Sequence, residues 1–306
     1  MAEPIVVWRF TDGKAGHENQ TAGLLAALRD CVSIDDYQLQ TASCRSSLAA
    51  FVTRRIPFGQ DLPDPDLIIG AGHATHLPML AARRARGGRA IVLMKPSLPG
   101  TWFDLCIIPA HDNPRVADNI LVTQGVLNRL QPSTSKDAST GLLLIGGPSA
   151  HVNWSDEAVL AQLRTVLEQD EVIHWTLTTS RRTPDSFLQK LGALPQQHLN
   201  VVPVTDAGPD WLVEQLAGAG CAWVSADSVS MVYEALTAGA AVGLLDVPYR
   251  SSNDRLAQGM KQLVAQGLVT TYADWRKGKT LQSPSIPFDE AARCADWIHK
   301  QWLTDR

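Results

Sequence analysis

Short β-branched runs alternate with amphipathic segments along most of this chain, and the alternation limits the fold more than any other feature. "IVVWRF" precedes "GHENQTAGLLAALR", and "DLIIGAG" precedes "HLPMLAARRAR". After residue 140 the pattern restarts with "GLLLIGG" and continues through "IHWTLTTS" and "NVVPV". Strands that alternate with helices in this way form parallel sheets with crossover helices. The sequence therefore predicts an α/β protein.

A polar segment divides the pattern into two halves. Residues 131–140, "QPSTSKDAST", contain no large apolar side chain and are typical of an interdomain linker. We therefore expect two doubly wound, Rossmann-like domains, residues 1–130 and residues 141–285, that face a cleft. In the tail, residues 286–306, apolar side chains at helical spacing predict an amphipathic helix. We expect this helix to pack back on the first domain.

Charge and cysteine content narrow the class of protein. The net charge of −4 argues against general nucleic-acid binding, which normally requires a basic surface. The five cysteines show no C-x-x-C pair and no metal-ligand spacing, so we expect reduced thiols and no metal site. No basic leader precedes an apolar stretch at the start, and no apolar run approaches the roughly 20 residues of a membrane span. These features predict a cytoplasmic protein that contacts a membrane only at its surface, if at all.

The loop after the first strand, "TDGKAGHENQ" at residues 11–20, is the first candidate site. It matches neither the dinucleotide-binding nor the P-loop glycine pattern. His17 lies in this polar glycine turn at an expected helix start, where an imidazole can act as a general base. We expect Lys14 to favour the neutral imidazole by charge repulsion, so His17 and Lys14 are the predicted catalytic residues. A purely structural histidine is the alternative.

A second polar turn of the first domain, "HDNP", follows the expected strand "LCIIPA". Because it comes at the carboxyl end of a strand, it belongs to the sheet edge at which ligands bind in such folds. "DPD" at residues 64–66 instead precedes a strand, and we interpret it as a polar lead-in rather than a metal site. The residues predicted to contact an acceptor are Asp12, Gly13, Gly16, His111 and Asp112.

Two loops of the second domain have features of an anion site. "GGPSAHVNWSD" at residues 146–156 places glycines and a serine before a helix, where free N–H groups and the helix dipole favour a phosphate. "TTSRRTP" at residues 178–184 offers two adjacent arginines that suit a diphosphate. A tight turn and a solvated surface pair are the alternatives. The predicted nucleotide-binding residues of these loops are Gly146, Gly147, Ser149, Ser180, Arg181 and Arg182.

The passage "SADSVSMVYEALTAGAAVGLLD", residues 225–246, predicts a β-α-β unit whose helix begins after Asp227 and ends at a glycine cap. Ser228 and Ser230 can hydrogen-bond a phosphate at the start of this helix, and Asp227 belongs with them to the predicted nucleotide-binding residues. Glu234 lies one turn beyond Ser230 on the same face, where a carboxylate can accept from paired ribose hydroxyls. An ordinary Asp/Ser helix cap is the alternative.

This β-α-β passage resembles the donor half of GT-B glycosyltransferases, in which a glutamate on the helix commonly binds the nucleotide ribose. In order, "TDGKAGHENQ", "FDLCIIPAHD", "TQGVLNRL", "IGGPSAH", "TSRRTP" and "DSVSMVYEA" resemble the elongated-mitochondria fission family, over roughly residues 5–250. That family includes plant organelle-fission proteins and bacterial members regarded as GT-B glycosyltransferases. The resemblance implies a GT-B-like, metal-independent enzyme without a cofactor. It would move a sugar from a nucleoside-diphosphate sugar to an unknown acceptor, for example a cell-envelope or lipid-linked one.

Two other functions stay open at this point. A nucleotide-sugar epimerase on the same fold should carry several carboxylates at strand ends, and only Asp12, Asp112 and Asp227 qualify. A degenerate donor loop would favour a non-catalytic fission adaptor, but Glu234 is present.

A stretch of the first domain combines apolar and basic residues. "AAFVTRRIPFG" at residues 49–59 mixes two phenylalanines and an isoleucine with Arg54 and Arg55. Such a segment could rest on an anionic membrane surface. A mobile loop or a buried helix end is the alternative.

Overall fold

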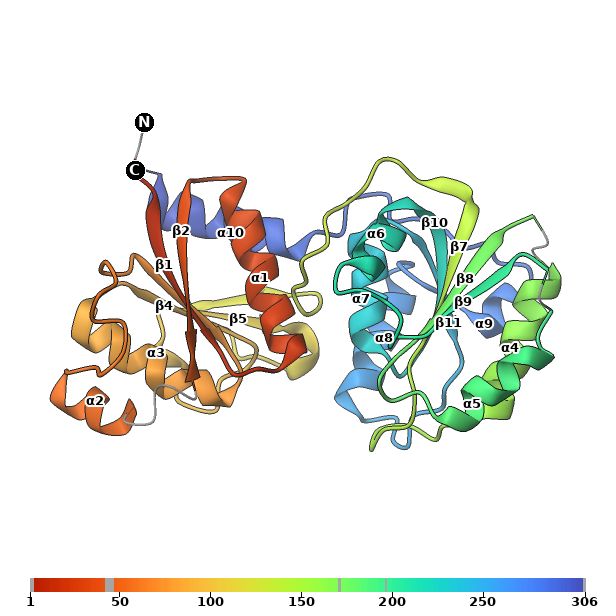
Figure 1. The fold of residues 1–306 in the computed structure, drawn as a ribbon, viewed down its shortest axis with the longest axis horizontal. Helices are drawn as coiled ribbons and strands as arrows, with labels where there is room; N and C mark the ends of the chain where they lie inside the picture. The colour runs from red at the N-terminus through yellow and green to blue at the C-terminus, as the bar shows by residue number, and fades with distance from the viewer. Residues whose placement is uncertain (1–2, 42–46, 170–171, 196, 305–306) are drawn as a thin grey trace. The chain divides into compact units, whose positions relative to one another are not determined.

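A computed structural model describes residues 3–41, 47–169, 172–195 and 197–304 of the chain. Its contacts divide the chain into two units. Unit 1 is Met1–Arg129 together with Asp289–Arg306, and unit 2 is Leu130–Phe288. Each unit contains one six-stranded sheet with helices on both of its faces (Figure 1). The two parallel sheets confirm the predicted doubly wound α/β fold.

The sheet of unit 1 has the strand order β2-β1-β3-β4-β5-β6, and every neighbouring pair is parallel. Its strands are β1 (Ile5–Thr11), β2 (Ile34–Gln40), β3 (Leu67–Ala71), β4 (Arg89–Leu93), β5 (Leu105–Pro109) and β6 (Ile120–Thr123). Its helical segments are α1 (Ala15–Arg29), α2 (Ser47–Thr53), α3 (His73–Arg86), η2 (Gly100–Trp102), η3 (Ala110–Asp112), α10 (Glu290–Ile298) and η5 (His299–Leu303).

The two faces of the unit 1 sheet belong to two separate cores. Successive strand residues point to opposite faces, so Val7 packs with α1 and α10, whereas Trp8 packs with α2 and α3. Both faces are covered, which explains why the central strands are continuous apolar runs rather than alternating ones.

The sheet of unit 2 has the strand order β12-β11-β10-β7-β8-β9, again with parallel neighbours. Its strands are β7 (Asp137–Ile145), β8 (His174–Thr179), β9 (Leu199–Val202), β10 (Ala219–Ser225), β11 (Ala241–Leu245) and β12 (Thr270–Thr271). Its helical segments are α4 (Asp156–Gln169), α5 (Asp185–Lys190), η4 (Leu191–Ala193), α6 (Trp211–Gly218), α7 (Val229–Thr237), α8 (Arg255–Ala265) and α9 (Tyr272–Trp275). Gly239 has φ +87° just after α7, as a C-terminal glycine cap requires.

The segment expected as a linker differs from that expectation. β7 begins at Asp137, so residues 137–140 are strand, and the residues before them already belong to unit 2. The Ser133 N–H donates to the Ala238 carbonyl at 3.2 Å, and Lys136 Nζ donates to the Leu216 carbonyl at 2.6 Å. The first half of β7 is polar because it is exposed or only half-buried. A strand end of this kind lacks the apolar pattern by which sequence reasoning recognises strands.

Helix α10 completes the core of unit 1 from the far end of the chain. The Asp289 side chain accepts from the Ala292 N–H and caps its first turn. Ala291, Cys294, Ala295 and Ile298 are buried in the same core as the inner face of α1. The apolar stripe of the tail is therefore the face that covers the sheet beside α1 (Figure 1).

Candidate functional site

Three loops meet at the carboxyl edge of the unit 2 sheet. They follow β10, β7 and β8, which are consecutive neighbours in the sheet. Because all three strands are parallel, their carboxyl ends lie side by side. The structure therefore brings together the glycine loop, the arginine loop and the start of α7, which the sequence predicted as separate parts of one nucleotide site.

The two glycines of the first loop are required for close packing. A Cβ on Gly146 would lie 2.1 Å from Asp227 Oδ2, and one on Gly147 would lie 2.2 Å from the Arg182 carbonyl oxygen. The Gly146 N–H donates to Ser225 Oγ at 2.7 Å, and the Gly147 N–H donates to Asp227 Oδ2 at 2.9 Å. These two N–H groups already have partners inside the protein. The glycines thus shape the edge, in place of the expected role as free phosphate donors.

Arg182 ties the three loops together. Its Nη2 donates to Asp227 Oδ2 at 2.9 Å, and its Nη1 donates to the carbonyls of Gly147 and Pro148 at 2.7 and 3.3 Å. The Asp227 side chain is fully buried, so its charge needs this partner. Arg182 is consequently committed to Asp227, whereas the exposed Arg181 forms no ion pair among the described residues. Of the two arginines, Arg181 is the one available to a diphosphate.

The start of α7 offers polar groups that the helix itself does not use. Ser228 is the N-cap residue, and its side chain makes no capping hydrogen bond. The first N–H groups of any α-helix lack an intrahelical partner. Asp227 Oδ1 is buried beside them and accepts no hydrogen bond from any described residue. Ser230 is exposed and Glu234 is half-buried one turn later. Anion donors, a buried acceptor and a carboxylate therefore lie along one helix.

A strap formed by two other loops lies beside this helix start. Val152, after β7, forms an antiparallel bridge with Tyr249, after β11. The Asn153 N–H donates to the Pro248 carbonyl at 2.8 Å, and the Arg250 N–H donates to the His151 carbonyl at 2.9 Å. β7 and β11 flank β10, so the paired loops pass the carboxyl end of β10. Tyr249 Oη donates to the Ala226 carbonyl at 2.5 Å and fixes the strap to the β10–α7 turn.

The strap carries a histidine–aspartate pair that sequence reasoning missed. His151 Nδ1 lies 2.6 Å from Asp254 Oδ2, and Asp254 Oδ1 accepts from the Leu256 N–H at 2.8 Å. Burial alone would raise the pKa of Asp254, but the hydrogen bonds from His151 and the Leu256 N–H outweigh it and hold the pKa below its ordinary value. The ionised carboxylate orients an imidazole whose side chain is 41% exposed. A carboxylate-oriented imidazole can transfer protons. His151 was part of the predicted glycine loop. The pair was missed because Asp254 is 103 positions away in the sequence.

In unit 1, His17 contacts a carboxylate rather than the predicted ammonium. His17 Nδ1 lies 3.0 and 2.9 Å from the two Asp12 oxygens, and the Asp12 side chain is almost fully buried. Lys14 Nζ lies 3.7 Å from the same carboxylate and is largely exposed. Both His17 and Lys14 therefore contact Asp12, and the side chain that holds the His17 ring is this carboxylate. The chain turns into α1 at Ala15, and this turn brings Asp12 and His17 together.

Gly72 allows the approach of the His17 ring to the next loop of unit 1. Its φ is +86°, and a Cβ there would lie 2.3 Å from His17 Cε1. Only glycine adopts this conformation without strain and leaves room for the ring. The loops after β1 and β3, which are sheet neighbours, thus meet at one point of the carboxyl edge.

Two further histidines of unit 1 form a cluster that the sequence did not reveal. Ser97 Oγ lies 2.5 Å from His73 Nδ1 and 3.2 Å from His76 Nδ1. Burial lowers the pKa of His76 to about 4, with a further contribution from His73. The cluster joins the start of α3 to the loop after β4. It extends the polar edge that His17 begins, because β3 and β4 are neighbours.

The other predicted acceptor residues lie on the same sheet edge. His111 and Asp112 form the short segment η3 after β5, and the Asp112 carbonyl accepts from Lys95 Nζ at 3.2 Å. Gly13 and Gly16 are exposed, and a Cβ on either would meet nothing. Within residues 3–41, 47–169, 172–195 and 197–304, no three His, Cys, Asp or Glu side chains group as metal ligands. No helix in that part of the chain is long and apolar enough to cross a membrane.

Two doubly wound parallel-sheet units, each with its polar loops at the carboxyl strand edge, define the GT-B fold. Solved structures share it at low identity. A UDP-N-acetylglucosamine 2-epimerase matches with TM-score 0.61 and 16% identity, covering 98% of this chain and 96% of its own. The UDP-GlcNAc 2-epimerase of Methanocaldococcus jannaschii, solved with UDP-GlcNAc and UDP, matches with TM-score 0.54 and 10% identity, covering 99% and 100%. MurG of Acinetobacter baumannii matches with TM-score 0.50 and 14% identity, covering 99% and 93%.

The sequence itself matches the family described as mitochondrial fission ELM1 over residues 15–302. The chain therefore belongs to the mitochondrial fission ELM1 family, which confirms the resemblance seen in its motifs. Comparison with functionally curated proteins gives no match.

Proposed function

We propose that unit 2 binds a nucleoside-diphosphate sugar and that the protein transfers the sugar to an acceptor hydroxyl without a bound metal. The observation that carries this proposal is the convergence of the three loops at the start of α7. Arg181 and the first-turn N–H groups would receive the diphosphate, and Glu234 would receive the ribose hydroxyls. Relatives in fold that were solved with UDP or UDP-GlcNAc support the ligand class.

The proposed transfer breaks the bond between the sugar C1 and the diphosphate oxygen and forms a bond between C1 and the acceptor oxygen. Negative charge develops on the leaving diphosphate, where Arg181 and the α7 dipole stabilise it. The acceptor hydroxyl loses its proton to a general base. His17 is the proposed base, because Asp12 fixes its ring and can stabilise the imidazolium that forms.

Calorimetric titration with UDP, and then with other nucleoside diphosphates, tests the donor site. Glu234→Ala and Arg181→Ala should each weaken binding by about 1–3 kcal/mol, the scale for losing hydrogen bonds to a charged group. Glu214→Ala is a matched control, because Glu214 is an exposed helical glutamate of the same unit on α6. Tight nucleotide binding that neither substitution changes would show that the proposed donor site is wrong.

A nucleotide-sugar epimerase is the second candidate, favoured by the His151–Asp254 pair. This pair belongs to the same unit as the proposed donor site, so proton transfer at the bound sugar would need no acceptor. Incubating UDP-GlcNAc with the protein in D₂O separates the two reactions by mass spectrometry. Deuterium in the recovered sugar would show that a C–H bond breaks and reforms, and it would favour the epimerase. Binding without turnover of any donor would favour the adaptor.

A further inference from the structure

Large apolar side chains are exposed on α2 and on the neighbouring η2 of unit 1. Leu48 and Val52 are 64% and 68% exposed, and they lie four residues apart on the same face of α2. Trp102 of η2 is 43% exposed. Single exposed apolar residues are common on soluble proteins, whereas a contiguous group usually marks a contact surface.

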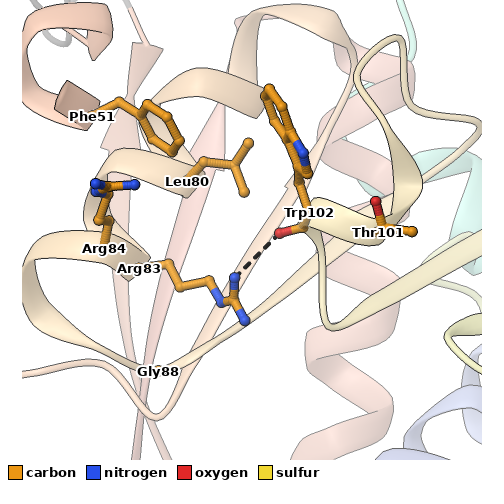
Figure 2. Close-up of a pocket in the computed structure, with 7 residues that line it drawn as sticks. All are labelled: Phe51, Leu80, Arg83, Arg84, Gly88, Thr101 and Trp102. Carbon is orange, nitrogen blue, oxygen red and sulfur yellow. Dashed lines mark hydrogen bonds between the residues drawn. The ribbon is translucent and has the colours of Figure 1, made fainter.

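An aromatic pair connects α2 to η2. The rings of Phe51 and Trp102 are stacked, with centroids 6.1 Å apart and an interplanar angle of 18°. They stand beside a hollow of about 540 Å³ between α2, α3 and η2, with Leu80 also in its lining (Figure 2). Below this surface Ala50, Ile56 and Phe58 are buried in the core. These buried side chains hold the apolar surface in place, so binding does not have to order this part of the chain first.

One arginine contacts this aromatic pair, and two more follow α2 directly in the chain. The Arg84 guanidinium lies 5.1 Å from the centre of the Phe51 ring, and Arg54 and Arg55 directly follow α2. All three are exposed and have no carboxylate partner in the described part of the chain. Arg83 differs, because it donates to Asp104 at 2.6 Å and to the Trp102 carbonyl (Figure 2). Three uncompensated positive charges therefore border the apolar surface of a chain whose net charge is −4.

We infer that this surface, formed by α2, η2 and the last turns of α3, docks on an anionic phospholipid membrane. Leu48, Val52 and Trp102 would enter the boundary between headgroups and acyl chains, where Trp is favoured. Arg54, Arg55 and Arg84 would contact lipid phosphates, which guanidinium groups bind well. A second copy of this chain suits the surface poorly. A two-fold contact would bring the three arginines of both copies into one interface, and like charges within an interface repel.

Vesicle co-sedimentation of the full chain tests the inference, with phosphatidylcholine vesicles compared to vesicles that also contain phosphatidylglycerol. We expect binding to the anionic vesicles only, and a decrease at high salt because the arginines act electrostatically. Removing each charge, by Arg54→Gln, Arg55→Gln or Arg84→Gln, should lower the partition coefficient about fivefold. The double variant Leu48→Ser, Val52→Ser should lower it further, by about tenfold or more.

Val116→Ser is the matched control, because Val116 is fully exposed in unit 1 on the segment before β6 and should bind like the unaltered protein. Thermal melts followed by circular dichroism check that each variant is folded. Equal binding of the Leu48→Ser, Val52→Ser variant, or equal binding to neutral and anionic vesicles, would overturn the inference. So would a dimer in light scattering that the same variant dissociates, because the surface would then join two copies.

Discussion

Asp12 and His17 lie five positions apart, and their contact determines how the first candidate site can work. A carboxylate that holds Nδ1 leaves Nε2 as the nitrogen that can exchange a proton with a ligand. Lys14, expected as the second catalytic residue, contacts the same carboxylate only at 3.7 Å and from a largely exposed position. The three residues therefore have unequal expected effects on catalysis.

His17→Ala should lower the turnover number by roughly 10²–10⁴-fold, the range for loss of a general base. Asp12→Asn should lower it as well, since the ring loses its orienting charge. Nucleotide affinity should stay unchanged in both variants, because the proposed donor residues belong to unit 2. Steady-state kinetics with a transferred sugar, combined with calorimetry, measures both quantities. Turnover in His17→Ala equal to that of the unaltered protein would exclude His17 as the base.

His76 predicts how stability depends on pH. Its folded pKa of about 4 lies below the unfolded value near 6.5, so the unfolded state binds the proton first as the pH falls. The contribution of His76 to the free energy of unfolding is fully present above pH 6.5. It is lost between pH 6.5 and 4, and it amounts to roughly 1–3 kcal/mol. Denaturant unfolding across this range should show a smaller loss in His76→Gln than in the unaltered protein. If the free energy of unfolding depended on pH equally in the two proteins, His76 would not be the group responsible for the loss.

Local sequence revealed the candidate residues more readily than their partners. His17 was recognisable from its glycine turn, and Glu234 from its spacing to Ser230. The ion pair between Arg182 and Asp227 was not recognisable from the sequence, because the two residues are 45 positions apart. They meet only because β8 and β10 lie on either side of β7. The pairing of His151 with Asp254 depends in the same way on strand order. The catalytic and nucleotide-binding roles themselves stay predictions.

At the scale of elements, short loops after neighbouring strands hold the unit 2 edge together. The glycine loop passes so close to the arginine loop that side chains have no room between them. The sequence indicated these loops, since glycine and serine follow apolar strands. It did not indicate where β7 begins, because the polar start of that strand has no apolar alternation to recognise.

Gly147→Ala should destabilise unit 2 by roughly 1–3 kcal/mol, the usual range for overpacking. The new Cβ would lie 2.2 Å from the Arg182 carbonyl, which is backbone and cannot rotate away. Gly208→Ala is the control, since a Cβ there meets nothing within 4 Å. Urea unfolding of both variants measures the difference. Equal midpoints would show that the arginine loop moves without cost.

At the scale of the whole molecule, the alternation of strands and helices was sufficient to predict two parallel sheets. This succeeded because a fully covered parallel sheet needs continuous apolar strands, which are easy to recognise. The composition of unit 1 from two distant segments is less evident in the sequence. An apolar stripe such as that of α10 shows that a helix is covered, and the expectation that the tail packs back on the first domain named no partner helix. In the structure α10 shares its buried core with α1.

Deletion of residues 289–306 should destabilise unit 1 and leave unit 2 unchanged. The deletion uncovers the apolar surface of the sheet and of α1, and it removes Cys294 and Ile298 from the core. We expect thermal unfolding to separate into two transitions, of which only the lower is shifted. Dye binding to exposed apolar surface should rise in the truncated protein. A single unshifted transition would show that α10 contributes no stability.

The membership of α10 in unit 1 has a consequence for how the chain is made. Unit 2 is synthesised in full before the segment that completes unit 1. Until α10 emerges, the inner surface of α1 in the nascent chain is uncovered. This surface includes Leu25 and Leu28, which are buried in the complete core. Such a surface is a target for chaperones in the interval. Unit 2, by contrast, is one continuous segment of the chain and needs no later segment to complete its core.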